Sequence, residues 1–172
     1  KVEARPELTA DDFIAIEGQV ADIRSQQTEL LEQLIEDTPD DEPNEKADLL
    51  YRLADLHAQK QRYWRFIGMD LYPKIEKAKK GKKGALEKEQ KTAFETAKKA
   101  MLDAVKVYKK IADNPAYKNY PDMDKTLFYF AYTLSSGKYM KEARIVYQRL
   151  IQDYPQSVYI PEAYLAFADY FR

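Results

Sequence analysis

The chain contains no cysteine, a single histidine and only five glycines among its 172 residues. Without cysteine, disulfide bonds, thiolate metal sites and cysteine nucleophiles are excluded. One histidine excludes a histidine-rich metal site and a histidine dyad. The glycines are scattered and form neither of the usual glycine-rich phosphate-binding motifs. These absences argue against a nucleotide-dependent enzyme, and we expect no catalytic residue, no metal and no cofactor.

Long apolar runs are also absent. No segment approaches the roughly 18 to 20 apolar residues that span a bilayer. From the residues at its start, we also expect no signal peptide. We therefore expect no direct membrane insertion. The length suits one domain, or one domain with an appendage, and we interpret the chain as an excised piece of a longer protein.

Charge is distributed unevenly along the chain. Residues 1–45 carry 3 basic and 14 acidic side chains, residues 46–112 carry 18 basic and 8 acidic, and residues 113–172 carry 7 of each. Opposite excesses favour close approach of the first two segments, although single surface ion pairs contribute only about 0 to 1 kcal/mol. We expect these two segments to pack together.

Helical periodicity covers nearly the whole chain, and strand signals are almost absent. Thr9 and Asp12 form a capping-box pattern before a long helix, which ends at the proline-interrupted acidic turn of residues 38–44. Spacings of three and four residues define an apolar seam along this helix, which consists of Phe13, Ile16, Val20, Ile23, Gln27, Leu30 and Leu34. We expect the seam to be the buried face.

A second helix is predicted from about Glu45 to about Pro73, with a length of about 40 Å that matches the first. Equal lengths and a short turn favour an antiparallel hairpin in which residues 9–36 fold back on residues 46–72. The alternative is a first helix that associates with copies of itself as a coiled coil, which the strict seam equally allows.

Lysines crowd residues 74–91, around two glycines. We interpret this run as a solvated, mobile loop between two helices. No aromatic side chain is interleaved for stacking on bases, so we expect no nucleic-acid partner. The functional alternative is a basic patch that binds an acidic polymer such as peptidoglycan, with its centre at Lys79, Lys80, Lys82 and Lys83.

Four further helices are predicted, over residues 85–112, 124–136 and 139–153 and from Pro161 to the last residue. We expect Gly137 to end the fourth helix of the chain in the left-handed conformation. These helices repeat: residues 127–134 recur 37 positions later, and residues 104–111 recur 39 positions later. Such a period is typical of stacked helical hairpins.

The best copy of this repeat spans residues 124–157 and resembles the tetratricopeptide repeat. The residues that carry the resemblance are Leu127, Phe130, Ala131, Leu134, Ala143, Tyr147, Leu150 and Pro155. The small side chains of Ala131 and Ala143 let two helices approach closely. The resemblance implies an all-α fold, in which antiparallel hairpins stack as a right-handed α-solenoid after a long N-terminal helix.

The expected organisation has four parts. Residues 1–45 form the long helix and acidic turn, packed on the next helix, and residues 46–123 form a divergent repeat-like hairpin with extended helices and the lysine-rich insertion. Residues 124–157 form the well-matched repeat, and residues 158–172 form the first helix of a further repeat.

The sequence motif of residues 154–164, Tyr-Pro-x-Ser-x-Tyr-x-Pro-x-Ala-Tyr, is similar to repeats of Gram-negative cell-envelope proteins. Those include the lipoprotein of the outer-membrane barrel assembly machine and the coordinator of the Tol-Pal system. The resemblance implies a periplasmic or outer-membrane-associated scaffold for other proteins in an assembly or motility machine, without excluding a cytoplasmic location.

In such a repeat protein the first helix of each hairpin faces the concave surface. The expected partner-binding residues are Tyr51, Asp55, Phe128, Tyr132, Leu165 and Asp169. Aromatic side chains there favour a groove for an apolar peptide, a partner helix or neighbouring repeats of the same chain. The alternative is that these side chains pack against adjacent helices. A hydrolase is the weakest hypothesis, because it would depend on surface carboxylates alone.

Overall fold

The computed structural model describes residues 9–170, and within them every regular element is helical. The elements are α1 (Ala10–Asp37), α2 (Pro43–Lys77), α3 (Lys80–Asp113), η1 (Pro115–Tyr117), α4 (Met123–Ser136), α5 (Met140–Asp153) and α6 (Ile160–Tyr170). This confirms the all-α class. The side chains of Phe13 and Asp169 lie outside the described part.

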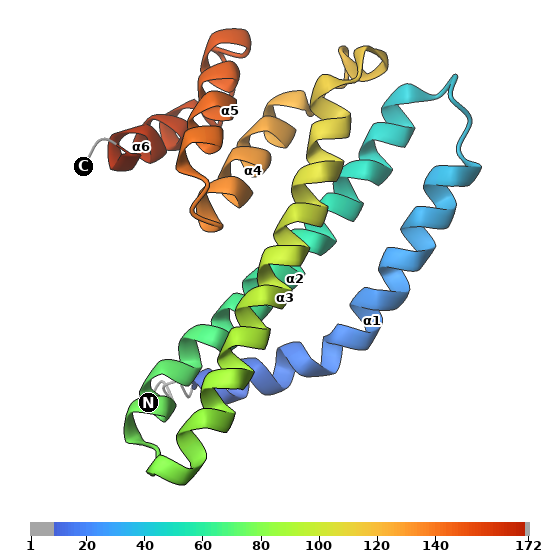
Figure 1. Ribbon diagram of the computed structural model, residues 1–172. Coiled ribbons are helices and arrows are strands. Elements are labelled where there is room, and N and C mark those ends of the chain that lie inside the picture. The colour runs from blue at the N-terminus through green and yellow to red at the C-terminus, as the bar shows by residue number, and fades with distance from the viewer. Residues whose placement is uncertain (1–8, 171–172) are drawn as a thin grey trace, which may run out of the picture.

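Each helix packs on the next one along the chain, from α1 on α2 to α5 on α6 (Figure 1). The α2–α3 pair is much longer than the α4–α5 pair, because α2 and α3 have 35 and 34 residues whereas α4 and α5 have 14 each. In Figure 1, α2 and α3 therefore continue well past the turn between α4 and α5. We call this extension the overhang (residues 69–98).

The residues that carry the repeat pattern form the core of the short hairpin. All of them except Pro155, which follows the end of α5, are buried. Ala131 and Ala143 lie at 0% and 1% exposure, so the two helices meet at small side chains as the sequence predicts. The core continues into the long hairpin through Tyr108 and Ile111 of α3.

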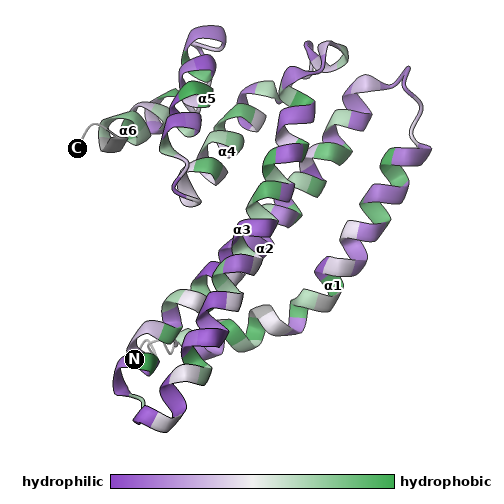
Figure 2. Cartoon of the chain, viewed as in Figure 1, coloured by the Kyte–Doolittle hydropathy of each residue, from purple (hydrophilic) through white to green (hydrophobic). Residues whose placement is uncertain are grey.

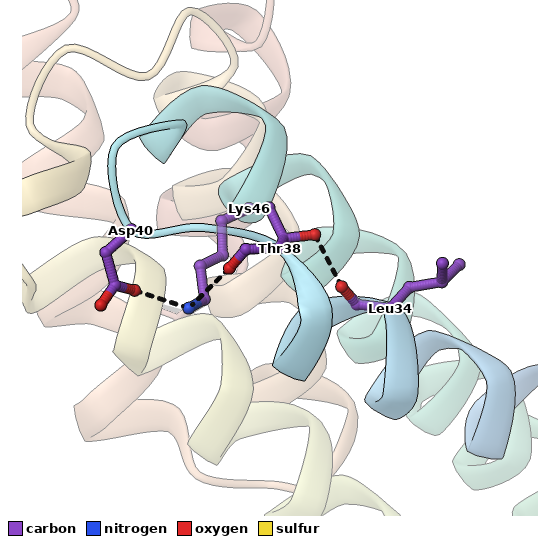
Figure 3. A network of polar contacts seen from close by, with 4 residues as sticks. All are labelled: Leu34, Thr38, Asp40 and Lys46. Carbon is purple, nitrogen blue, oxygen red and sulfur yellow. Dashed lines mark hydrogen bonds and ion pairs between the residues drawn. The ribbon is translucent and has the colours of Figure 1, made fainter.

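The start of α1 is as predicted. Thr9 Oγ1 accepts a hydrogen bond from the backbone N–H of Asp12 at 3.1 Å, and the Asp12 carboxylate accepts one from the backbone N–H of Thr9 at 3.0 Å. At the other end, Lys46 Nζ lies 2.7 Å from the Asp40 carboxylate and 3.4 Å from the Thr38 carbonyl (Figure 3). The side chain of Thr38 donates to the carbonyl of Leu34, so the corner between α1 and α2 is closed by polar contacts.

The predicted seam of α1 is wrong, although α1 does pack on α2. Ile16, Ile23, Leu30 and Leu34 are between 42% and 60% exposed. The side chains that lie toward α2 belong to the adjacent stripe, and they include Arg24, Thr28, Leu31 and Ile35. Both stripes have helical spacing, and one helix packed on one neighbour can bury only one of them fully.

The lysine-rich segment is helical, which contradicts the predicted loop. Helix α2 continues through Pro73 to Lys77, and α3 begins at Lys80. Lysine and glutamate dominate this segment and have high helix propensity, and each helix has the other as a neighbour. Pro73 lies near the end of α2, where it removes one backbone hydrogen bond without ending the helix.

Gly137 is not in the left-handed conformation. Its φ is −84°, and the residue with a positive φ is Lys138, at 69°. The reason for a glycine at this position is space, because a Cβ there would lie 1.9 Å from Met101 Sδ. Gly137 therefore lets the α4–α5 turn approach α3 closely.

Candidate interaction surfaces

We define the inner surface by the six residues predicted to bind a partner, Tyr51, Asp55, Phe128, Tyr132, Leu165 and Asp169. They come from α2, α4 and α6. Tyr51 is half-buried, and its ring lies 6.1 Å from the ring of Tyr108 and 6.4 Å from that of Tyr129. Lys125 Nζ lies 4.8 Å from the centre of the Tyr51 ring, within the range of a cation–π contact.

Phe128 is 9% exposed and lies at the centre of a cluster of aromatic rings. Its ring centre is 5.0 Å from Tyr159, 5.2 Å from Tyr129 and 6.0 Å from Tyr147. This agrees with the packing alternative for Phe128 and departs from the open groove that we expected. Tyr132 stacks on Phe128 at 6.4 Å and is 44% exposed, so it carries the aromatic cluster to the protein surface.

The remaining members of the inner surface are placed differently. Asp55 is half-buried and accepts a hydrogen bond from Gln59 Nε2 at 2.9 Å. Leu165 is 68% exposed on α6, where Tyr164 is also exposed, and Val158 is exposed in the connection before this helix. The structure thus joins Tyr51, Phe128 and Tyr132 in one aromatic network, and it leaves Leu165 as part of an apolar surface at the C-terminal end.

Burial disfavours the ionised form of four tyrosines in and around this network. It raises the pKa of Tyr51 and Tyr108 above the ordinary range and that of Tyr147 to about 12. Burial likewise raises the pKa of Tyr159.

Two residues of the network, Tyr129 and Tyr159, were missed by sequence reasoning. Tyr159 lies in the connection between α5 and α6, where helical periodicity gives no signal. The connection is held by Ser157, whose hydroxyl donates to the Asp124 carboxylate at 2.6 Å and accepts from the backbone N–H of Tyr159 at 3.2 Å. The only sequence signal for the fixed position of Tyr159 is the Ser-x-Tyr motif of residues 157–159.

A second surface is the basic tip, which we define as Lys79, Lys80, Lys82 and Lys83. All four side chains are exposed at the end of the α2–α3 hairpin, which is strongly hydrophilic in Figure 2. The acidic start of α1 lies close to the end of α2, because Lys74 Nζ is 3.5 Å from the Asp11 carboxylate. Within α2, Lys74 Nζ also lies 2.9 Å from the Asp70 carboxylate. The contact between Lys74 and Asp11 agrees with the expected approach of the acidic and basic segments.

Within residues 9–170 no group of three histidine or carboxylate side chains could hold a metal ion. In the same part of the chain, no helix combines the length and the apolar content needed to cross a bilayer. Comparisons with family models, curated proteins and solved structures found no match.

Proposed function

We propose that the chain is a non-enzymatic module that binds other proteins, built from stacked helical hairpins of the tetratricopeptide type. The order of contacts supports the stack, since α3 joins the long hairpin to α4, and α5 receives α6. The buried positions of Leu127, Ala131 and Leu150 support the assignment of the repeat.

One observation carries the binding function: Tyr132 brings the aromatic network to the protein surface, and Val158, Tyr164 and Leu165 expose apolar side chains at the C-terminal end. Exposed apolar patches of this kind mark sites where another protein packs. The occupant is an apolar peptide, a partner helix or a further repeat of the same longer chain. Because Phe128 is buried, Tyr132 and Leu165 are the side chains that reach the partner.

The sequence motif of residues 154–164 supports a role in the Gram-negative cell envelope, as a scaffold within a multiprotein assembly or motility machine. In the structure this segment forms the connection after α5, which is held by Ser157, and the start of α6. A connection between two packed helices at this position is compatible with the proposed repeat.

The function is tested by a quantitative pull-down from an envelope extract of the source organism. We expect the wild-type chain and the Ile145→Ala variant to capture the same proteins, since Ile145 is exposed on α5 outside the inner surface. The double variant Tyr132→Ala/Leu165→Ala should lose at least one of them. If the double variant captures the same set at the same level, the inner surface is not the binding site.

The basic tip supports a second candidate function, the binding of an acidic polymer such as peptidoglycan. Its lysines lie on a helical end, which presents them at fixed positions. Sedimentation with purified peptidoglycan should show binding that falls steeply with salt. Lys80→Glu/Lys83→Glu should abolish it, whereas Lys118→Glu/Lys141→Glu makes the same charge change elsewhere on the surface and should not. Binding that does not respond to salt would contradict this function.

A further inference from the structure

The difference in length between the two hairpins creates a step at the point where the overhang passes the α4–α5 turn. A cleft of about 530 Å³ lies in this step, between α2, α3 and residues 136–139. The turn is fixed there by two contacts: Gly137 allows close approach to Met101, and an Arg65 guanidinium N–H donates to the carbonyl of Ser136. The cleft is therefore built by the packing of the hairpins.

Large apolar side chains of the overhang line this cleft. Met69 and Tyr72 are 53% and 58% exposed, and the ring of Phe94 lies 6.0 Å from that of Tyr72. Phe94 packs against Gly68, where a Cβ would come within 2.6 Å of the ring. The aromatic wall is thus held in place, although one side of it faces solvent.

The charged side chains that line the cleft are all positive. They are Arg65 on α2, Lys98 on α3 and Lys138 in the α4–α5 turn, and no carboxylate occurs among the described residues that line it. Lys138 is placed there by its left-handed backbone conformation, with φ at 69°. Three cations from three elements therefore surround an apolar wall.

The surface beyond the cleft is mixed in charge. Tyr72, Phe94 and Lys98 also line a shallow depression along the overhang, and the other charged side chains of this depression are Glu87, Lys91 and Glu95. The excess of positive charge is therefore confined to the cleft.

We infer that the step cleft binds a peptide segment in which carboxylate side chains adjoin a bulky apolar side chain. Charge complementarity selects the acidic partner, because the lining side chains of the cleft carry only positive charge. The apolar wall selects a partner with an aromatic or branched aliphatic residue. The cleft lies apart from the inner surface, so the two can be tested separately.

Fluorescence anisotropy with a fluorescein-labelled peptide of sequence EDFLDE tests this inference on the full chain. We expect saturable binding that weakens with salt and is lost with the control peptides EDGSDE and QNFLNQ. The variants Lys98→Glu/Lys138→Glu and Tyr72→Ala should each raise Kd by about tenfold or more. These side chains are exposed, and circular dichroism checks that the variants remain folded.

Matched controls separate the cleft from general charge attraction. Lys99→Glu/Lys141→Glu makes the same change in net charge with exposed lysines outside the cleft lining, and Leu102→Ala removes an exposed apolar side chain of α3. Both should change Kd by less than about twofold. The inference is overturned if EDFLDE does not bind up to about 1 mM. It is also overturned if the control variants weaken binding equally, or if Tyr132→Ala/Leu165→Ala removes it, because the peptide would then lie on the inner surface.

Discussion

The short hairpin, α4–α5, and the overhang of the long hairpin, α2–α3, are built from similar amphipathic helices but bury them differently. In the short hairpin Leu127, Ala131 and Leu150 are completely buried. On the overhang Met69 and Tyr72 are about half exposed, and the buried positions include the small residues Ala93 and Ala97. The short hairpin has α3 and α6 as neighbours, whereas the overhang continues past the α4–α5 turn. The spacing of apolar residues thus predicts that a segment is helical. Whether those residues are buried depends on whether another helix packs along the whole length of that segment.

The largest expected effect contrasts one core position with one overhang position. Leu150→Ala removes a completely buried side chain and should lower the free energy of unfolding by about 2 to 5 kcal/mol. Met69→Ala removes an exposed one and should change it by about 0.5 kcal/mol or less. Urea unfolding followed by circular dichroism measures both. Similar losses would mean that the overhang is covered in solution.

A second test concerns the close approach of α4 and α5. Ala131→Leu or Ala143→Leu should destabilise the protein by about 1 to 3 kcal/mol through overpacking. Ala168→Leu, at an exposed position of α6, is the matched control and should have little effect. Unchanged urea midpoints in both core variants would remove the repeat assignment.

Two glycines are expected to respond with opposite signs. Gly137→Ala places a Cβ against Met101 and should destabilise by about 1 to 3 kcal/mol. Gly84→Ala has open space around the new Cβ within α3 and should stabilise by about 0.5 to 1 kcal/mol. Thermal unfolding distinguishes the signs. Destabilisation by Gly84→Ala would show that the basic tip is not helical in solution.

The two stripes of α1 can be compared through adjacent leucines. Leu31 packs against the core and Leu30 is 60% exposed, so Leu31→Ala should cost about 1 kcal/mol and Leu30→Ala about 0.5 kcal/mol or less. Sedimentation equilibrium on the unmodified chain then tests the coiled-coil alternative. A concentration-independent monomer agrees with the fold, whereas a trimer that is lost on deletion of residues 1–37 would show that copies of α1 cover the exposed stripe.

The smallest expected effect is the pH dependence of the corner between α1 and α2. The hydrogen bond from Lys46 lowers the pKa of Asp40 below its ordinary 3.8, and the same contact raises the pKa of Lys46 above 10.5. A lowered carboxyl pKa stabilises the fold above about pH 4, and this contribution is lost as pH falls through the folded-state value. Carboxyl titration by NMR should show the low pKa, and Lys46→Met should restore the ordinary value. An unchanged pKa in that variant would refute the contact.

Most of the short hairpin could be predicted from the sequence, because its apolar residues have neighbours on both sides and local spacing suffices. The same holds for the Thr9 capping box, which depends on residues three apart. Of the inner surface, the sequence predicted that Tyr51, Phe128 and Tyr132 lie on helices, and it left open whether Phe128 lines a groove or packs against a neighbour. The burial of Phe128 depends on Tyr159, which reaches it from a connection without periodicity.

The errors share one physical origin, since each depends on a contact distant in sequence. The α1 seam and the α2-facing stripe have the same spacing, and only the position of α2 selects between them. From the sequence, Gly137 is predicted to be a helix cap. In the structure, its role is to leave space for the side chain of Met101, which lies on another helix. The composition of the lysine-rich run predicts a loop, because the packing of α2 against α3, which supports helices there, cannot be seen in the local sequence.

The first turn of α3 opposes its own helix dipole. Lys79 makes no capping side-chain bond, and no acidic residue lies in that turn, so cationic side chains surround the positive end of the helix. Amide hydrogen exchange should therefore be graded along α3, fast near Lys80 and slow from Ala104 to Ile111, where the helix is buried. An anion bound at the basic tip would slow the exchange of the backbone amides near Lys80 first. Amide exchange at this end of α3 would therefore show whether an anion is bound.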